Sequence, residues 1–130
     1  MATPLTEEFI ARLQHFEATA ELGSLLALFH EDAEVLTLGR TEPARGHDEV
    51  EGFWRDYRAM FRGIRSEFTH VIEGSGGAVL EWVSRGALAS GEPVEYRGVT
   101  VLETDAGRIR RCRTYYDSAV FLSGGAATDG

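Results

Sequence analysis

The sequence has no lysine and only one cysteine, and these shortages exclude several kinds of chemistry. All thirteen basic residues are arginine. Schiff-base catalysis and a phosphate-binding P-loop both need a lysine amine, so both are excluded. Cys112 has no second cysteine with which to form an internal disulfide, which is compatible with a reducing compartment.

The sequence also lacks long apolar runs and an excess of positive charge. Residues 1–16 contain Glu7, Glu8 and Arg12 where a signal peptide would be apolar. No window approaches the roughly 18 apolar residues of a membrane span. The net charge of -8 and the pI near 4.9 repel phosphate backbones and anionic lipids. We therefore expect a cytoplasmic protein with no nucleic-acid or membrane partner.

The size and composition are those of one ordinary globular domain. The chain has 130 residues and 14.3 kDa, of which 43% are hydrophobic and 26% charged. A second full domain does not fit this length. We expect one domain over residues 1–122, followed by a flexible tail of small and polar residues at 123–130.

Three helices are expected in the first half of the chain. Thr6 is placed to cap a helix that ends near Ala20. The spacing of apolar residues between Leu22 and Phe29 predicts a second, short helix. A third helix of about four turns is predicted by an apolar face at helical spacing. That face consists of Val50, Phe53, Trp54, Tyr57, Met60, Phe61 and Ile64.

The second half of the chain is rich in strand-forming residues. A brief strand at Glu34–Leu38 and a loop at Gly39–Gly46 precede the third helix. Four longer strands follow, separated by short turns, which predicts an antiparallel meander. They are Ser66–Glu73, Ala78–Leu88, Val94–Glu103 and Arg108–Phe121. Helices followed by a sheet indicate an α+β fold in which a curved antiparallel sheet wraps around the helices and leaves a hollow lined by aromatics.

Five short segments resemble a known family. The residues from about Glu7 to Phe121 are similar to the SnoaL-like branch of the nuclear transport factor 2 superfamily. The segments are Leu28-Phe29-His30-Glu31-Asp32-Ala33, Ala44-Arg45-Gly46-His47-Asp48-Glu49-Val50, Tyr96-Arg97-Gly98-Val99, Gly107-Arg108-Ile109 and Arg113-Thr114-Tyr115-Tyr116-Asp117.

The resemblance implies a cone-shaped α+β barrel of the cystatin-like type, with a pocket between helices and sheet. It also implies a homodimer formed through the convex face of the sheet. Members include polyketide cyclases, ketosteroid isomerase, limonene epoxide hydrolase and binding modules without catalysis, so the fold does not determine the function.

The catalytic residues of two of these enzymes are absent. The epoxide hydrolase residues match Val35, Thr37, Glu81, Val83 and Thr114, and none retains the required side chain. The isomerase base matches Thr37, and its two oxyanion donors match Leu13 and Val99. A hydroxyl cannot replace a carboxylate base, so we expect neither reaction. The acid–base aspartate of the polyketide cyclases has its only counterpart in Asp117, at the outer end of the last strand.

These matches suggest a pocket for a small, mostly hydrophobic molecule, which can be cyclic. No cofactor is expected, and any chemistry would be proton transfer. The residues predicted to line the pocket are Thr37, Trp54, Tyr57, Phe61, Val83, Val99, Thr114 and Tyr116.

Glu81 and His70 are the candidate catalytic residues. A carboxylate facing inward among apolar residues would be a suitable general acid or base, and a neutral imidazole a suitable base. Tyr57 or Tyr116 would donate a hydrogen bond to a developing enolate. Only one of Glu81 and Trp82 can face the hollow, because neighbouring strand residues point to opposite faces. If Trp82 does, the site is an apolar binding pocket.

The other reactive side chains favour structural roles. Alternation places Cys112, Thr114 and Tyr116 on the pocket face of the last strand, and Arg111 and Arg113 on the other face. We expect those arginines to pair with Glu95, Glu103 or acids of a partner. No metal site is expected, because neither His30 nor His47 has a second histidine two or four residues away. The second hypothesis is a non-catalytic ligand-binding or dimerisation module.

Overall fold

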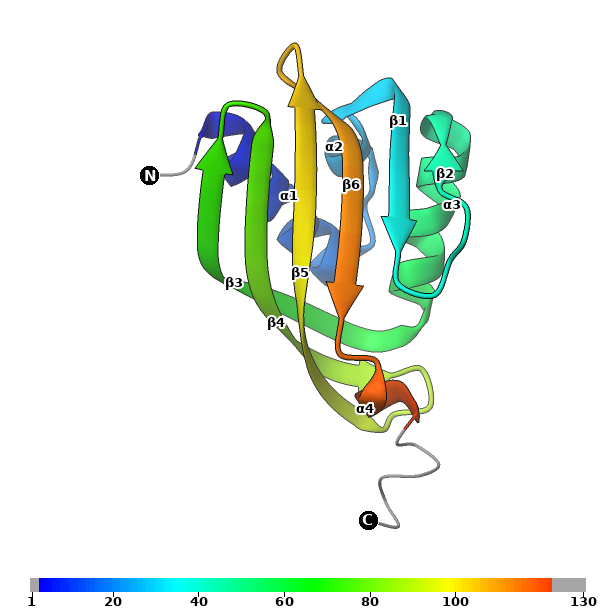
Figure 1. The fold of residues 1–130 in the computed structure, drawn as a ribbon. Coiled ribbons are helices and arrows are strands. Elements are labelled where there is room, and N and C mark those ends of the chain that lie inside the picture. The colour runs from blue at the N-terminus through cyan, green and yellow to red at the C-terminus, as the bar shows by residue number, and fades with distance from the viewer. Residues whose placement is uncertain (1–2, 123–130) are drawn as a thin grey trace.

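The computed structural model describes residues 3–122, which form an α+β fold (Figure 1). The tail predicted at 123–130 lies outside the described residues. Among the described residues, no helix is long and apolar enough to cross a membrane. The elements are α1 (Pro4–Thr19), α2 (Gly23–Leu26), β1 (Phe29–Thr37), β2 (Ala44–Arg45), α3 (Gly46–Ala59), β3 (Phe61–Gly74), β4 (Gly77–Leu88), β5 (Pro93–Asp105), β6 (Arg108–Tyr116) and α4 (Ala119–Leu122).

The six strands form one curved sheet that does not close into a complete barrel. Its strand order is β2-β1-β6-β5-β4-β3. The meander from β3 to β6 is antiparallel, as predicted, whereas β1 joins the edge of β6 in parallel. Helices α1, α2 and α3 all lie on one face of the sheet, its concave face (Figure 1). The predicted fold class is confirmed.

The first helix begins three residues earlier than predicted. The Thr3 hydroxyl accepts a hydrogen bond from the Thr6 amide at 3.3 Å, so Thr3 is the cap and Thr6 is not. Pro4 occupies the first turn, where its fixed φ fits a helix and its missing N–H is not needed. The helix ends at Ala20, near the predicted end, in a left-handed conformation.

The third helix ends earlier than its apolar spacing predicted. It ends at Ala59, and Phe61 and Ile64 lie in β3. A register shift between Phe61 and Gly63 inserts an extra residue into the strand. Because of this bulge, Phe61 and Ile64 are three residues apart and both buried. The bulge in β3 thus gives Phe61 and Ile64 the three-residue spacing of buried positions that is typical of a helix.

Two further elements differ from the prediction. The helix expected between Leu22 and Phe29 is reduced to the single turn α2, and Phe29 instead begins β1. Phe29 is fully buried and pairs with Ile109 of β6, so sheet pairing determines its conformation. The predicted loop contains the two-residue strand β2, and the end of the last predicted strand is the helical turn α4.

The core is built around Trp54 on α3. Its ring contacts the rings of Phe16, Phe29, Phe53 and Tyr57, with centroids between 5.2 and 6.3 Å apart. The contacts with Phe16, Phe53 and Tyr57 are edge-to-face, a favoured packing of aromatic rings, and the Phe29 ring is tilted by 59°. A second apolar cluster contains Phe61, Ile64, Trp82, Val94 and Tyr96. The two clusters share Tyr57 and Phe68 as partly buried neighbours, and the candidate site lies among these residues.

Candidate functional site

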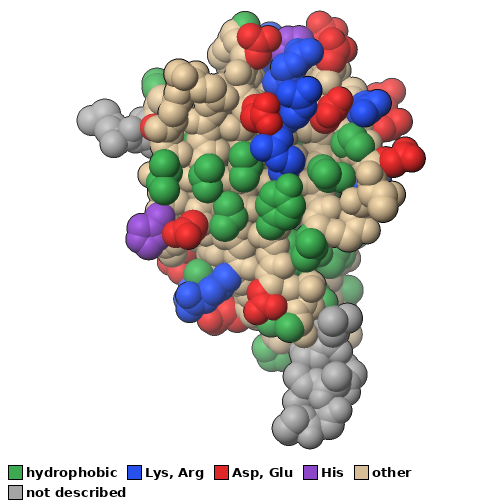
Figure 2. Space-filling view, viewed as in Figure 1, with side chains coloured by type: hydrophobic (Ala, Val, Ile, Leu, Met, Phe, Trp, Pro, Cys, Tyr) green, Lys and Arg blue, Asp and Glu red, His purple; other side chains and the backbone are tan. Residues whose placement is uncertain are grey.

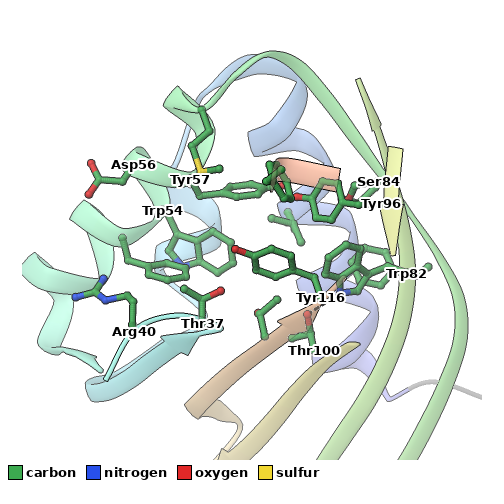
Figure 3. A pocket seen from close by; sticks show the side chains of 17 residues that line it. Thr37, Arg40, Trp54, Asp56, Tyr57, Trp82, Ser84, Tyr96, Thr100 and Tyr116 are labelled. Atoms are coloured by element: carbon green, nitrogen blue, oxygen red, sulfur yellow. Dashed lines mark hydrogen bonds between the residues drawn. The ribbon is translucent and has the colours of Figure 1, made fainter. Parts of the chain in front are cut away.

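An interior cavity of about 280 Å³ lies between the helices and the concave face of the sheet. Eight of the 17 residues that line it are aromatic (Figure 3). Residues from α1, α3, α4 and five strands meet there, so the cavity is assembled from the whole chain. The aromatic residues that line it are Phe53, Trp54, Tyr57, Phe68, Trp82, Tyr96, Tyr116 and Phe121.

The structure brings five of the predicted pocket residues to this cavity. They are Thr37, Trp54, Tyr57, Thr114 and Tyr116. Thr114 and Tyr116 face inward on β6, and Cys112 on the same face is completely buried, as the alternation predicted. In Figure 3, the Tyr116 ring points across the cavity towards Trp54.

Phe61 does not line the cavity, although it was predicted to. Its ring packs behind the wall, 5.5 Å from the Tyr57 ring and 6.2 Å from the Tyr96 ring. The reason is its position at the start of β3 and not on the last turn of α3. Phe61 therefore supports two residues of the wall without reaching the interior.

Val83 and Val99 lie on the convex face of the sheet, outside the cavity. Both line a shallow open depression on that face. The inward positions of β4 are taken by Leu80, Trp82 and Ser84, so the odd-numbered Val83 must face outward. The prediction that Val83 and Val99 line the interior pocket is therefore wrong in its placement.

Glu81 and His70, the candidate catalytic residues, are also on the convex face. Glu81 Oε1 lies 3.1 Å from His70 Nδ1, and both side chains are more than half exposed. Trp82 takes the inward position instead, with its indole N–H donating to Thr100 Oγ1 at 2.9 Å. The structure thus does not bring Glu81 and His70 to the cavity, and the predicted proton transfer by them has no geometric basis there.

The wall has a buried carboxylate behind it, which the sequence reasoning missed. Glu17 on α1 is 1% exposed. The Tyr57 hydroxyl donates to its Oε2 at 2.7 Å, and the Ser66 amide and hydroxyl donate to its two oxygens at 2.8 and 2.6 Å. Ser84 Oγ lies 2.6 Å from Ser66 Oγ. Because the Ser66 hydrogen is used on Glu17, Ser84 must donate to Ser66.

The sequence did contain a signal for Glu17. Phe9, Leu13 and Phe16 form the buried face of α1, and Glu17 is four residues from Leu13 on the same face. A charged residue on the apolar side of an amphipathic helix is uncommon and needs a buried partner. Its partners are 40 or more residues away on α3 and β3, so no local pattern could identify them.

Two tyrosines of the cavity wall are kept neutral by their surroundings. Burial, followed by the charge of Glu17, raises the pKa of Tyr57 well above its usual value of 10.0. The same two causes raise the pKa of Tyr96. Figure 3 shows Tyr57, Tyr96 and Ser84 together at one side of the cavity. The two tyrosine hydroxyls on this side are therefore protonated, and the hydrogen of Tyr57 is directed at Glu17.

One buried polar atom of Trp54 has no hydrogen-bond partner. The indole nitrogen is unpaired among residues 3–122. Such an unpaired buried donor costs about 1–3 kcal/mol.

The entrance to the cavity is more polar than its interior. Arg40 and Asp56 are both exposed residues that line it, and Met60 is 45% exposed beside them. The entrance therefore carries one positive and one negative charge. Neither charge sign is favoured at the entrance, unlike the acidic surface as a whole.

The remaining reactive side chains have structural surroundings. Burial raises the pKa of the Cys112 thiol to about 12, so it is not a reactive thiolate. Arg111 and Arg113 pair with Glu103 on the convex face, as predicted. His47 Nε2 bonds to the Phe29 carbonyl at 3.0 Å. Residues 3–122 contain no group of three or more His, Cys, Asp or Glu side chains able to hold a metal ion.

The sequence matches one protein family over most of its length. A profile of the family described as "SnoaL-like domain" matches residues 7–112. No curated protein matches the chain.

Many solved structures share the fold. One is a protein with a ketosteroid isomerase-like fold from Catenulispora acidiphila, in complex with trimethylamine, at TM-score 0.80 and 20% identity, covering 99% of this chain and 98% of that one. A protein named as a SnoaL-like polyketide cyclase, from a Jannaschia species, matches at TM-score 0.79 and 15% identity, over 95% and 94%. TerC, co-crystallised with polyporic acid, matches at TM-score 0.78 and 17% identity, covering 93% of this chain and 97% of that one. At these identities the likeness shows the fold alone.

Proposed function

Because this chain belongs to the SnoaL-like family of the nuclear transport factor 2 superfamily, we propose that it binds a small, mostly apolar cyclic molecule in the interior cavity and catalyses cofactor-independent proton transfer on it, as an isomerase or cyclase does. One observation carries this proposal. The cavity is aromatic, and a cluster of hydroxyl groups on its wall is hydrogen-bonded to the buried carboxylate of Glu17.

The size of the cavity limits the ligand. Its 280 Å³ is close to the lower end of the roughly 300–1,000 Å³ that is usual for small-molecule sites. The aromatic wall favours a flat, apolar body, because ring-to-ring contacts add to the free energy of burial. A ligand of one or two rings fits these limits.

The polar groups of the wall define where the ligand's oxygen atoms lie. The hydroxyl groups of Thr37, Thr114 and Tyr116 can donate or accept hydrogen bonds. A small cyclic ketone or phenol suits such a wall. TerC was co-crystallised with polyporic acid, and the Catenulispora protein was solved in complex with trimethylamine, which supports a small molecule as the partner here.

Ligand binding can be measured directly, because the only two tryptophans, Trp54 and Trp82, both line the cavity. We expect 5-nitrobenzotriazole, a flat nitroaromatic that absorbs tryptophan emission, to quench the intrinsic fluorescence in a saturable way. Thr114→Phe fills the cavity from β6 and should weaken this binding by about tenfold or more, which corresponds to about 1.4 kcal/mol.

Tyr115→Phe is the matched control, since Tyr115 is the next residue of β6 and is 47% exposed outside the cavity. It should leave the dissociation constant unchanged. Equal weakening by both variants, or no saturable quenching of the wild type, would contradict binding in the cavity.

A non-catalytic binding module is the second candidate. It is favoured by the position of Glu17, which lies behind the wall and does not itself line the cavity. In this case the hydroxyl network only holds α1 against β3 and shapes the wall. The two candidates differ in whether the Glu17 network takes part in proton transfer.

A further inference from the structure

We propose that Tyr57 accepts the proton that the ligand loses, while Glu17 behind it takes up the hydroxyl proton of Tyr57, so that the two residues act as one base. This inference rests on the proposed function and assigns the groups that perform it. Tyr57 is the catalytic residue, because it lines the cavity, and Glu17 acts through it.

The direction of the hydrogen bonds supports this assignment. The donors of Tyr57 and Ser66 all point at the Glu17 carboxylate, which receives three bonds of 2.6 to 2.8 Å. Two hydroxyl groups of the cavity wall, those of Tyr57 and Ser66, therefore contact Glu17 Oε2 directly. The Ser66 hydroxyl is also bonded to Ser84, which leaves Tyr57 as the group through which we route the proton.

The bond to Glu17 also determines what Tyr57 can offer a ligand. A phenol has one hydrogen, and that of Tyr57 is used on Glu17. Only the lone pairs of its oxygen remain, so Tyr57 can accept a hydrogen bond from a ligand but cannot donate one. This differs from the donor role expected for Tyr57 from the sequence. The Ser66 and Tyr96 side chains also lie next to the Tyr57 oxygen.

Tyr57 cannot act as a free phenolate. Burial and the charge of Glu17 raise the pKa of Tyr57 well above 10.0, so its neutral form persists at neutral pH. Its oxygen gains basicity only when its own proton leaves at the same time. The Glu17 Oε2 atom, 2.7 Å away, is within the distance at which such a transfer occurs.

The step conserves atoms and charge. A C–H or O–H bond of the ligand breaks, a new O–H bond forms at Tyr57, the former Tyr57 O–H bond breaks, and an O–H bond forms at Glu17 Oε2. The electron pair of the broken bond stays on the ligand as an enolate or phenolate. Return of the proton to another ligand atom completes an isomerisation and restores the Glu17 carboxylate.

The groups packed around Glu17 are compatible with this role. Arg58 on α3 donates from Nε to the Glu17 backbone carbonyl at 2.9 Å and from a terminal nitrogen to the Phe61 carbonyl at 3.0 Å, so these bonds are to backbone oxygens and not to the Glu17 carboxylate. Ser66 and Ser84, on β3 and β4, are uncharged. Tyr96 on β5 is neutral at ordinary pH, because burial raises its pKa. No second carboxylate competes for the proton among these partners.

The test uses 5-nitrobenzisoxazole, whose ring opens to a coloured phenolate when a base removes its C–H proton. Glu17→Gln and Tyr57→Phe should each lower kcat by about 100-fold. The double variant should fall no further than either single variant, because the two residues act as one unit. Both single variants should keep the wild-type KM, because neither change alters the shape of the cavity.

Glu81→Gln is the matched control, the same change of carboxylate to amide at an exposed site outside the cavity. It should keep the wild-type rate. Tyr57→Phe leaves Glu17 with both Ser66 bonds, so it tests the proposal even if Glu17→Gln fails to fold. Wild-type kcat in Tyr57→Phe, or in a folded Glu17→Gln, would overturn the proposal.

The outcome also separates this inference from the proposed function. A wild-type protein that binds 5-nitrobenzotriazole but opens 5-nitrobenzisoxazole no faster than acetate does would overturn the assignment of the base and leave cavity binding intact. A protein that neither binds nor reacts would overturn both.

Discussion

Glu17 shows how one residue can change the chemistry of a cavity that it does not line. A lone buried carboxylate is costly unless several donors satisfy it. Here the donors come from α3 and β3, and one of them, Tyr57, forms part of the cavity wall. The sequence predicted the position of Tyr57 but not its partner, because partners 40 residues apart are set by tertiary packing.

The neutral tyrosines predict how stability changes at alkaline pH. The folded protein raises the pKa of Tyr57 and Tyr96 above that of an unfolded tyrosine, which is about 10. Their contribution to stability is therefore complete below pH 10 and is lost as the pH rises, because only the unfolded chain ionises. Above pH 10, each such group can lower the free energy of unfolding by up to about 1.4 kcal/mol for each pH unit.

Tyr96→Phe removes one of these groups and should make the alkaline loss of stability shallower. The measurement is urea unfolding at a series of pH values on either side of 10. Tyr115→Phe provides the comparison, since Tyr115 is an exposed tyrosine of the neighbouring strand. A Tyr96→Phe protein that loses stability as steeply as the wild type would contradict this prediction.

At the scale of the elements, period-two alternation was the most useful sequence signal. It placed Cys112 and Thr114 inward and Arg111 and Arg113 outward on β6, and the structure agrees. It could not decide between Glu81 and Trp82, because either register of β4 is consistent with alternation. Pairing of β4 with β3 and β5, which depends on residues far apart in sequence, settles that Trp82 faces inward.

The position of Trp82 depends on Gly98, directly opposite on β5. A Cβ atom at Gly98 would overlap the six-membered part of the Trp82 indole and lie 2.6 Å from the Tyr115 carbonyl oxygen. We expect Gly98→Ala to push the indole into the cavity and to lower the free energy of unfolding by about 1–3 kcal/mol.

Urea unfolding measures the loss, and the quenching by 5-nitrobenzotriazole measures the change in the cavity. Gly63→Ala is the control, because Gly63 also lies in a strand but has no atom within 4 Å of the added Cβ. Equal stability of the two alanine variants would show that Trp82 does not rest on Gly98.

For the whole molecule, the sequence predicted the α+β class and the order of the main strands, because turns and periodicity are local signals. It did not predict the parallel pairing of β1 with β6, which joins residues about 80 positions apart. The cavity could be predicted only in part for the same reason. Thr37 and Thr114 were found through the family resemblance and Trp54 through the apolar face of its helix, whereas Ser66 and Ser84 reach the cavity wall through strand pairing.

The convex face carries the last prediction, that two copies of the chain associate through it. Apolar side chains form a band across this face, with charged side chains on either side of it (Figure 2). Exposed large apolar residues of the sheet are Ile72 on β3, at 70%, and Tyr115 on β6, at 47%. The sheet also carries exposed or half-exposed ion pairs, Arg85 with Glu67 and Arg113 with Glu103. A face with apolar residues between charges of both signs can be complementary to itself across a two-fold axis.

Sedimentation velocity should therefore show a dimer of the wild-type chain. Ile72→Asp combined with Tyr115→Asp should convert it to a monomer, because each carboxylate would be buried without a partner in the interface. Leu38→Asp is the control, since Leu38 is also an exposed apolar residue, at 39%, but follows the end of β1. It should leave the dimer intact. Quenching by 5-nitrobenzotriazole should persist in the monomer, because the cavity opens on the opposite face of the sheet; a monomeric wild type, or a dimer that survives both aspartates, would contradict association through this face.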